Sequence, residues 1–525
     1  MSEWWKDAVF YQVYPRSFLD TDGDGVGDLE GIRRKLPYVA SLGVGAIWLS
    51  PVFPSPMADF GYDVSDYTGI DPMFGDLAGF DRLLEEAHGR GLKLIIDQVY
   101  SHSSDRHPWF QESRKDRTNP KADWYVWADP APDGGPPNNW LSVFGGAAWS
   151  WDSRRRQYYL HNFLEEQPDL NFHEPAVREA ILNVARFWLD RGVDGFRLDV
   201  ANFYVHDAQL RDNPVAEGHS GDRPYNFQRH LYDRSRPETL QFLAKLRALT
   251  DEHQGRMMVA EVFSADPIVR MTQYTEGAAR LHTAYSFSFL HANALTPSLI
   301  RRSLEAWTSQ DAWPSWSFSN HDVARVLTRW GGPETPARAK LLLALLLCLR
   351  GTPFLYQGEE LGLPQAEVPF ERLRDPEAIR FWPEGLGRDG CRTPMPWRTS
   401  ADAGFSAAEP WLPIDPRHLP LSVEAQEADP DSTLAFTRRF LALRQANRAL
   451  RRGTIAFRDS AEPLLIFERS EAGERILCLF NLGQTEGTYT DRALCDAETL
   501  AMDHGGLLED GSARLPPGSV LIVRL

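Results

Sequence analysis

The feature that most constrains the fold of this chain is a regular alternation of strand-like and helix-like segments over most of its length. Short apolar runs typical of buried strands occupy residues 9–15, 45–50, 93–97, 195–200, 257–262, 316–320 and 353–357, and a weaker run at 283–287 makes eight. Amphipathic helical patterns such as 77–88 and 177–191 lie between them, as crossovers between parallel strands require. The pattern predicts an α/β fold, a (β/α)8 TIM barrel.

The spacing of these segments breaks once, between residues 97 and 195. Because that interval holds a stretch rich in proline and glycine at 130–137, we expect an inserted loop-rich subdomain over residues 100–171, after the third strand. After a helical pattern at 433–448, short strand-like runs follow at 464–467, 476–480 and 520–525. They predict a C-terminal antiparallel β-sandwich over 449–525, which leaves residues 1–99 and 172–448 to the barrel.

The net charge of the chain limits the classes of partner that it can bind. Its 73 acidic and 56 basic side chains give a net charge of −17, which repels nucleic-acid phosphates and anionic lipid. We therefore expect no nucleic acid and no membrane partner, and a small ligand that is neutral or cationic. The longest apolar run, 341–349, is too short to span a bilayer and predicts a buried helix.

Cysteine usage and the N-terminal residues bear on the compartment. Cys348, Cys391, Cys478 and Cys495 show neither close pairing nor metal-site spacing, so we expect reduced thiols. The opening MSEWWK lacks the basic-then-apolar pattern of a secretory signal. Both observations favour the cytoplasm. The expected assembly is a monomer or weak homo-oligomer.

Three acidic side chains stand at the ends of strand-like runs, namely Asp199, Glu261 and Asp322. In a parallel β/α barrel such positions meet at the C-terminal face, where active sites lie. The 17 Trp, 16 Tyr and 28 Phe side chains offer rings on which the apolar faces of sugars stack, so carbohydrate chemistry is the favoured interpretation. The alternative for each acid taken singly is an ion pair with a barrel arginine.

Several motifs stand in a fixed order along the chain: DQVYSH at 97–102, QPDLN at 167–171, GFRLDV at 195–200, VAEV at 259–262, SNHD at 319–322 and RDGCRTPMPW at 388–397. Together they resemble the α-amylase superfamily (glycoside hydrolase family 13), and within it the α-glucosidase and oligo-1,6-glucosidase branch. The resemblance covers the whole chain. It departs from the usual motifs at Ser101, where Asn is common, and at Ala260 and Val262, where Gly and Met are common.

The resemblance implies a catalytic role for each acid. Asp199 would be the nucleophile, Glu261 the general acid and then the general base, and Asp322 would hold sugar hydroxyls. In a retaining mechanism the first two carboxyls lie about 5 to 5.5 Å apart. On a strand Arg197 faces the same side as Asp199, where its charge keeps the nucleophile ionised. The resemblance also implies that His102 and His321 donate to glucose hydroxyls.

A pocket closed at one end is implied in the same way. The resemblance assigns its closed end to Asp59 and Tyr62, with Arg392 opposite, although a structural ion pair is the alternative for Arg392. Phe163 and Phe144 would wall the pocket or merely pack in the inserted subdomain. An enzyme with such a pocket releases or transfers single glucose units, so endo-acting amylase activity is not expected.

The segment DTDGDGVGD at 20–28 places oxygen ligands at alternate positions, with glycines that allow a sharp turn around a hard cation. It departs from an EF-hand because Gly31 stands where the bidentate Glu would be. The resembling glucosidases hold a structural metal in this loop, which implies ligands Asp20, Asp22, Asp24, the Val26 carbonyl and Asp28. Ca²⁺ is the expected ion and Mg²⁺ its rival, and a metal-free solvated turn is the alternative.

Linkage preference stays open. In the resembling family a valine after the nucleophile, here Val200, goes with α-1,6 bonds, whereas residues 369–373 and 390–394 look more like α-glucosidases that take short α-1,4 substrates such as maltose and also transfer glucose. We weight the second signal slightly more.

The segment 202–237, with Asp207, His219, Tyr225 and Arg229, is expected over the acceptor side. A sucrose isomerase or trehalose synthase, and a non-catalytic partner subunit, are the other classes; the second would be expected to lose the acids.

Overall fold

The computed structural model of the chain describes residues 3–218, 223–307, 309, 311–383, 385 and 387–525. Its largest sheet within these ranges has eight strands in the order β10-β11-β1-β2-β3-β7-β8-β9, and all neighbours pair in parallel. They are β1 (Phe10–Val13), β2 (Ala46–Leu49), β3 (Lys93–Gln98), β7 (Gly195–Leu198), β8 (Met257–Val262), β9 (Thr283–Ser286), β10 (Ser315–Ser317) and β11 (Thr352–Tyr356). A parallel bridge from Ala284 to Pro314 joins the two edge strands and closes the predicted barrel.

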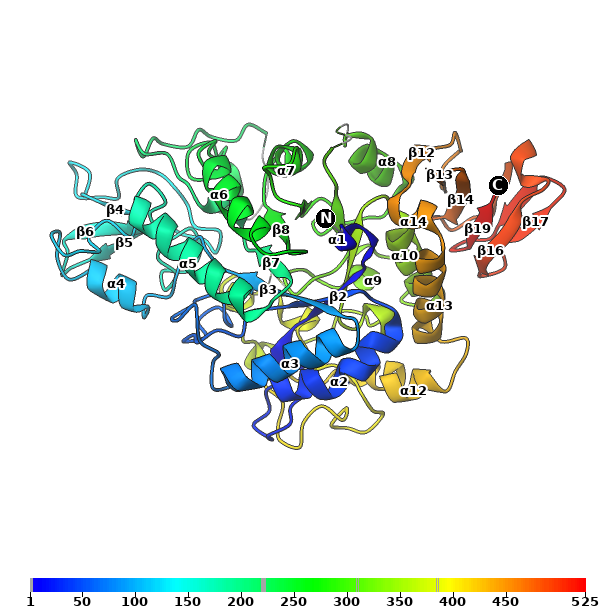
Figure 1. Cartoon of the computed structure of the whole chain (residues 1–525), viewed down its shortest axis with the longest axis horizontal. Coiled ribbons are helices and arrows are strands. Elements are labelled where there is room, and N and C mark those ends of the chain that lie inside the picture. The colour runs from blue at the N-terminus through cyan, green and yellow to red at the C-terminus, as the bar shows by residue number, and fades with distance from the viewer. Residues whose placement is uncertain (1–2, 219–222, 308, 310, 384, 386) are drawn as a thin grey trace.

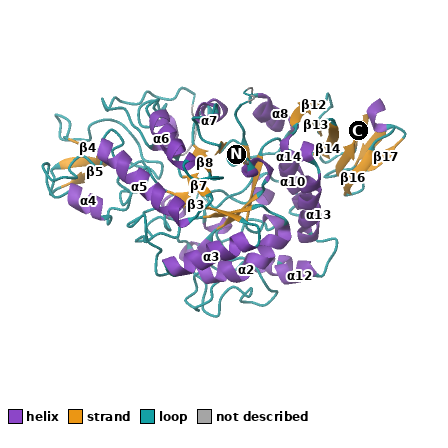
Figure 2. Ribbon diagram, viewed as in Figure 1, coloured by secondary structure: helices purple, strands orange, loops and turns teal. Residues whose placement is uncertain are grey.

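Helices lie around this barrel, and those between consecutive strands connect them (Figures 1 and 2). They are α1 (Trp4–Asp7), α2 (Leu29–Leu42), α3 (Leu77–Gly89), α5 (Pro175–Arg191), α6 (Thr239–Asp251), α7 (Pro267–Thr275), α8 (Pro297–Glu305), α9 (Val326–Arg329), α10 (Pro336–Cys348), α11 (Pro376–Arg380), α12 (Val423–Glu427), α13 (Thr433–Ala446) and α14 (Arg448–Arg452). The apolar run at 341–349 forms most of the buried helix α10, as predicted.

Local signals explain where the barrel helices begin and end. The α2 helix begins after Asp28, whose carboxylate accepts from the Gly31 amide, and it ends at Gly43 with φ +90°. The α5 helix begins with Pro175 and ends at Gly192 with φ +105°. These caps let each helix stop abruptly, so the chain turns directly into β2 and β7.

The barrel interior changes character along its axis. Alternate residues of the strands point inward, and those toward the N-terminal end form an apolar cluster that includes Phe10, Trp48, Ile95, Val259 and Phe354. Two residues further toward the C-terminal ends of the strands, the inward positions of β3, β7 and β8 carry charged side chains. The barrel is therefore a packed apolar core that becomes ionic at its C-terminal end.

A small antiparallel sheet follows β3. It consists of β4 (Trp127–Ala128), β6 (Gln157–Leu160) and β5 (Trp149–Asp152) in that order, preceded by α4 (Pro108–Ser113). Its own apolar cluster includes Trp140, Trp149 and Leu160. The sheet falls inside the range 100–171 for which the sequence predicts an insert, and Figure 1 shows it at the opposite end of the molecule from the C-terminal strands.

Two antiparallel sheets form the C-terminal part. The five-stranded sheet contains β12 (Thr454–Phe457), β13 (Leu464–Glu471), β14 (Glu474–Asn481), β19 (Val520–Arg524) and β16 (Glu498–Asp503); the three-stranded sheet contains β15 (Gly487–Thr490), β18 (Ser512–Leu515) and β17 (Leu507–Glu509). Leu477 and Leu479 pack between the sheets, while Ile476 and Phe480 face the barrel helices. This alternation is the signature of the predicted sandwich.

No helix among the described residues is long and apolar enough to cross a membrane.

Candidate active site

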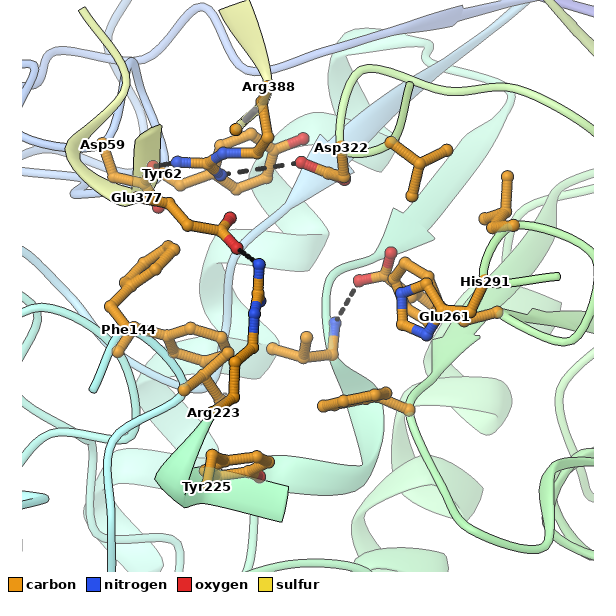
Figure 3. A pocket seen from close by; sticks show the side chains of 18 of the residues that line it. Asp59, Tyr62, Phe144, Arg223, Tyr225, Glu261, His291, Asp322, Glu377 and Arg388 are labelled. Carbon is orange, nitrogen blue, oxygen red and sulfur yellow. Dashed lines mark hydrogen bonds and ion pairs between the residues drawn. The ribbon is translucent and has the colours of Figure 1, made fainter. Parts of the chain in front are cut away.

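A cavity of about 650 Å³ opens at the C-terminal end of the barrel. It brings together most of the residues singled out in the sequence: Asp59, Tyr62, His102, Phe144, Phe163, Asp199, Glu261 and Asp322. Figure 3 shows Asp322 and Glu261 facing the same space, with Asp59 and Tyr62 at one end. Arg197, His321 and Arg392 are buried behind these side chains.

The strands place the acids. Asp199 directly follows β7, Glu261 is the fifth residue of β8, and Asp322 lies beyond the end of β10. Strand β7 approaches β8 closely because Gly195 lacks a side chain: a Cβ at Gly195, whose φ is +152°, would lie 1.9 Å from the Met257 carbonyl oxygen. The close approach brings the ends of β7 and β8, and hence Asp199 and Glu261, to one site.

One guanidinium joins the acids beneath the cavity. Arg197 Nη1 lies 2.5 Å from Asp199 Oδ1 and 2.8 Å from Asp97 Oδ1, and its Nη2 lies 2.6 Å from Glu261 Oε1. Its Nε also donates to the Tyr285 hydroxyl at 3.0 Å. Arg197 is completely buried, which by itself would lower its pKa, but the charges of Asp97 and Glu261, with the hydroxyls of Tyr285 and Tyr62, hold that pKa well above the ordinary value. A single cation thus fixes the positions of both central carboxylates.

The two central carboxyls differ in acidity. Burial raises the pKa of Glu261 to about 8, and the negative charge of Asp199 adds to the shift while Arg197 opposes it. Burial also raises the pKa of Asp199, to about 7, again against the charge of Arg197. The two carboxyls interact, so the pair titrates as a unit and these values belong to the two groups together. The arrangement can hold one ionised and one protonated carboxyl side by side.

Asp322 titrates differently. Burial alone would raise its pKa, but the pKa of Asp322 is lowered by neighbouring cationic groups. Arg392 Nη2 lies 3.1 Å and Arg388 Nη1 3.7 Å from Asp322 Oδ1. A charge on His321 would lower the pKa of Asp322 most, but burial lowers the pKa of His321 itself well below its ordinary value and keeps that imidazole neutral. Arg392 and Arg388, with Arg197, are therefore the cations that hold Asp322 ionised.

The closed end of the cavity corrects one prediction. The arginine that pairs with Asp59 is Arg388, with Nη2 2.7 Å from Asp59 Oδ1, and not Arg392. Arg392 is fully buried, and its Nε donates to the backbone oxygen of His321, so its guanidinium reaches Asp322 from behind. The 3-10 turn Asp389–Cys391 (η6) lies between the two arginines in the chain, so Arg388 reaches Asp59 while Arg392 reaches the backbone of His321. Arg388 is held in turn by Asp375, 2.8 Å away.

Tyr62 and the two histidines form the floor of this end. The Tyr62 hydroxyl lies 2.6 Å from His321 Nε2 and donates to Asp97 Oδ2 at 3.0 Å, and its ring stacks on His321. The other His321 nitrogen contacts Gln12. His321 is fully buried, and its Nε2 also lies 3.2 Å from Asp322 Oδ2, so its ring joins Tyr62 to that acid. His102 lines the cavity and lies 3.1 Å from the Tyr62 carbonyl oxygen.

Aromatic rings wall the cavity on two sides. Phe163 packs edge-on against Phe144 and also contacts His102, so both predicted phenylalanines line the space. On the other side lie Phe263 and Phe287, which the sequence analysis did not single out. They follow the ends of β8 and β9, so their positions after barrel strands are a signal that could have indicated them.

The long segment after β7 is only partly involved. Tyr225 lines the cavity, whereas Asp207 forms ion pairs with Arg211 and Arg236. The amide of Arg229 donates to the Pro214 carbonyl, which ties the segment to itself. The remaining residue named there, His219, lies outside the described residues.

The loop at 20–28 brings three of its predicted ligands together. Single carboxylate oxygens of Asp20, Asp22 and Asp28 lie within 4.8 Å of one another. Asp24 lies outside this group and accepts from the Val26 amide at 2.7 Å. Like charges cluster here, and burial together with Asp22, Asp20 and Asp28 raises the pKa of Asp24. Oxygen donors so arranged fit a hard divalent cation.

Known proteins resemble the chain over its whole length. A family model described as "Alpha amylase, catalytic domain" matches residues 12–453. A probable alpha-glucosidase of Rhizobium meliloti (strain 1021) is 52% identical, over 100% of this chain and 97% of that protein. An oligo-1,6-glucosidase of Heyndrickxia coagulans is 38% identical, over 93% and 94%.

Solved structures match equally fully. An alpha-glucosyl transfer enzyme, XgtA, superposes with a TM-score of 0.96 at 53% identity, and the trehalulose synthase MutB from Pseudomonas mesoacidophila MX-45 with 0.91 at 32%; both cover 100% of each chain. The barrel, the buried acids at its C-terminal end and these matches agree. The chain therefore belongs to the α-amylase superfamily, glycoside hydrolase family 13, and within it to the branch of the α-glucosidases and oligo-1,6-glucosidases.

Proposed function

We propose that this glycoside hydrolase is an exo-acting, retaining α-glucosidase that releases or transfers single α-glucose units from the non-reducing end of short α-glucosides such as maltose. The observation that carries the proposal is the contact of one buried arginine, Arg197, with both Asp199 and Glu261 at a cavity whose end is closed by Asp59 and Arg388. Two carboxyls with different acidities at one bond are what a glycosidase needs.

In the first step Asp199 attacks the anomeric carbon of the terminal glucose. A bond forms between a carboxylate oxygen and that carbon while the bond to the leaving oxygen breaks, and Glu261 gives its proton to the leaving oxygen. Arg197 Nη1 lies 2.5 Å from Asp199 Oδ1, and this positive charge favours the carboxylate form of the nucleophile. The product is a covalent glucosyl-enzyme and a free alcohol.

In the second step Glu261, now ionised, takes a proton from water or from the hydroxyl of another sugar. The resulting oxygen nucleophile attacks the anomeric carbon and displaces Asp199, so the released or transferred glucose keeps the α configuration. Asp322, kept ionised by Arg388 and Arg392, would accept hydrogen bonds from sugar hydroxyls and strengthen them as the ring distorts.

The closed end of the cavity supports exo action. The Asp59 and Arg388 side chains are 6% and 8% exposed and bind one another, so a sugar chain cannot pass beyond them. Their charged groups match the hydroxyls of a chain end, and Tyr62 lies beside them (Figure 3). The binding of one terminal glucose follows, with the remainder of the substrate toward solvent.

A proton NMR time course with maltose and with isomaltose in separate tubes tests the proposal. Early α-glucose from the glycone, with maltose consumed faster, is the expected result. Early β-glucose from that position would remove the roles given to Asp199 and Glu261, and consumption of neither substrate would remove the glucosidase function.

Two other activities have specific support. Val200 and the likeness to an oligo-1,6-glucosidase favour action on isomaltose, which the same time course detects as faster loss of isomaltose. The likeness to a trehalulose synthase favours rearrangement of sucrose, and incubation with sucrose would then yield isomeric disaccharides with little free glucose.

We also propose that the 20–28 loop holds a structural divalent cation, Ca²⁺ before Mg²⁺. Asp20, Asp22 and Asp28 would supply carboxylate oxygens, with Asp24 and the Val26 carbonyl from the same loop. The ion would neutralise clustered charge and stabilise the turn, and it would take no part in the reaction. We further propose that the enzyme works in the cytoplasm, as a monomer or weak homo-oligomer, and the four unpaired cysteines fit a reducing compartment.

A further inference from the structure

An ion pair crosses the cavity. Arg223 immediately precedes the 3-10 turn Pro224–Phe227 (η3), and its Nη2 contacts Oε1 of Glu377 in the first turn of α11. Both residues line the same cavity as Asp199 and Glu261, and Figure 3 shows their side chains pointing toward one another. One partner comes from the segment after β7 and the other from the segment after β11.

Exposure places this pair at the outer end of the cavity. The side chain of Arg223 is 44% exposed and that of Glu377 13%, whereas Asp59 at the closed end is 6% exposed. A substrate whose terminal glucose lies between Asp59 and Asp199 extends its leaving group away from the closed end. The Arg223–Glu377 pair therefore lies on the side that the leaving group, and later the acceptor, must occupy.

Each partner stands on a separately anchored support. Next to Arg223, the ring of the buried Tyr225 stacks on His230 with ring centroids 3.8 Å apart. Glu377 follows Asp375, the N-cap residue of α11, and Asp375 holds the cavity arginine Arg388. The guanidinium of Arg223 also lies 5.4 Å from the ring centroid of Phe381. The segment after β7 and the segment after β11 thus meet through the Arg223–Glu377 ion pair and through the contact of Arg223 with the Phe381 ring.

We propose that the Arg223–Glu377 pair limits the length of the substrate, so that the enzyme favours disaccharides over trisaccharides of the same linkage. A third sugar unit must separate the pair or be turned aside, and separation leaves the mostly buried Glu377 without its cation. The proposal rests on the proposed glucosidase function and concerns its acceptor side. It makes both residues determinants of specificity, with no part in bond breaking.

The test compares kcat/KM for glucose release from maltose and maltotriose, or from isomaltose and isomaltotriose if the linkage is α-1,6. In Arg223→Gln and in Glu377→Gln the trisaccharide-to-disaccharide ratio should rise by roughly fivefold or more, as expected for loss of a partly buried charge pair. The double swap Arg223→Glu with Glu377→Arg should return the ratio toward that of the wild type. Salt should raise the ratio in the wild type and not in the single variants.

A matched control breaks a pair far from the cavity. Arg186 and Glu252 form an exposed ion pair between α5 and α6, 2.8 Å apart, and Arg186→Gln should leave the ratio unchanged. Unchanged ratios in both cavity variants overturn the proposal. If neither single variant folds, a wild-type ratio that does not respond to salt overturns it. Failure of the wild type to release glucose from any of these substrates contradicts the proposed function instead.

Discussion

The amide nitrogen of Val200 lies 3.2 Å from Oε2 of Glu261 and donates to it, so the residue after Asp199 is bound to the carboxyl on the neighbouring strand. Val200 has φ +33° and ψ +50°, a left-handed conformation that is unfavourable for a β-branched residue. This strained turn aims an amide at one acid and presents the adjoining acid to the cavity. The Val200 amide therefore holds one oxygen of the Glu261 carboxyl, Oε2, while Arg197 holds the other, Oε1.

The raised pKa values predict a narrow pH optimum. Below the pKa of Asp199, about 7, the nucleophile is protonated, and above that of Glu261, about 8, the acid has lost its proton, so kcat/KM should fall on both sides. The acidic and alkaline sides of the pH profile give apparent pKa values that belong to the Asp199–Glu261 pair and not to either residue alone. The measurement is kcat/KM for glucose release from maltose across pH, because the leaving sugar of maltose needs the proton of the general acid.

The Glu261→Gln variant identifies the alkaline limb. It should lose that limb, and its rate should fall by about 10² to 10⁴ on substrates with poor leaving groups, the usual contribution of a general acid. The fall should be smaller on a substrate with an activated leaving group, since that group departs without a proton. An alkaline limb that survives the substitution would assign it to another residue.

Removing Asp59 should weaken binding of the terminal glucose. Asp59→Ala leaves the buried Arg388 with Asp375 but without its partner at the cavity, so kcat/KM for the disaccharide should drop by at least ~30-fold, equivalent to about 2 kcal/mol. Arg388→Lys, which keeps the charge but loses the planar fork, should show a similar loss. Steady-state kinetics with thermal melting of each variant separates this effect from unfolding; a retained kcat/KM would place the sugar elsewhere.

The side chain of Val200 should influence linkage. By the family resemblance a valine at this position goes with α-1,6 bonds, so Val200→Thr should raise the ratio of kcat/KM for maltose over isomaltose. The ratio is its own control, because damage to the strained turn or to Glu261 lowers both rates together. A ratio that stays constant would show that the preference is set by other residues.

Chelation should lower thermal stability. If the 20–28 loop binds a divalent cation, EDTA removes the neutralising charge among Asp20, Asp22 and Asp28, and the melting temperature falls. Free cation at 100 times Kd contributes about 2.7 kcal/mol. Differential scanning calorimetry with added Ca²⁺ or Mg²⁺ measures the recovery and ranks the ions. Asp22→Asn should abolish the response to EDTA, and a response identical to that of the wild type would place the cation elsewhere.

The sequence was sufficient for the barrel because local patterns determine its elements. Each predicted strand run overlaps an observed strand, and the 77–88 pattern matches α3 almost residue for residue. The three acids were recognisable because their positions at strand ends coincide with ordered motifs. Arg197 was predicted to face Asp199 from the period of a strand alone, and the 2.5 Å contact agrees.

What the sequence could not predict depends on how loops fold against one another. Arg388 and Arg392 are the same residue type four positions apart, and only the short turn between them decides which one reaches Asp59. Arg223 and Glu377 lie in different loops, so no local pattern links them. Such contacts form only after the barrel has fixed where each loop begins.

In the proposed mechanism Asp199 forms a covalent bond to glucose. The most direct measurement is to trap that intermediate with a slowly hydrolysed fluorinated α-glucosyl fluoride, digest the protein, and locate the added mass by tandem mass spectrometry. We expect one label per active chain, on Asp199, that disappears in Asp199→Asn. A label on Glu261 or Asp322, or turnover of the reagent with no covalent adduct under any condition, would contradict it.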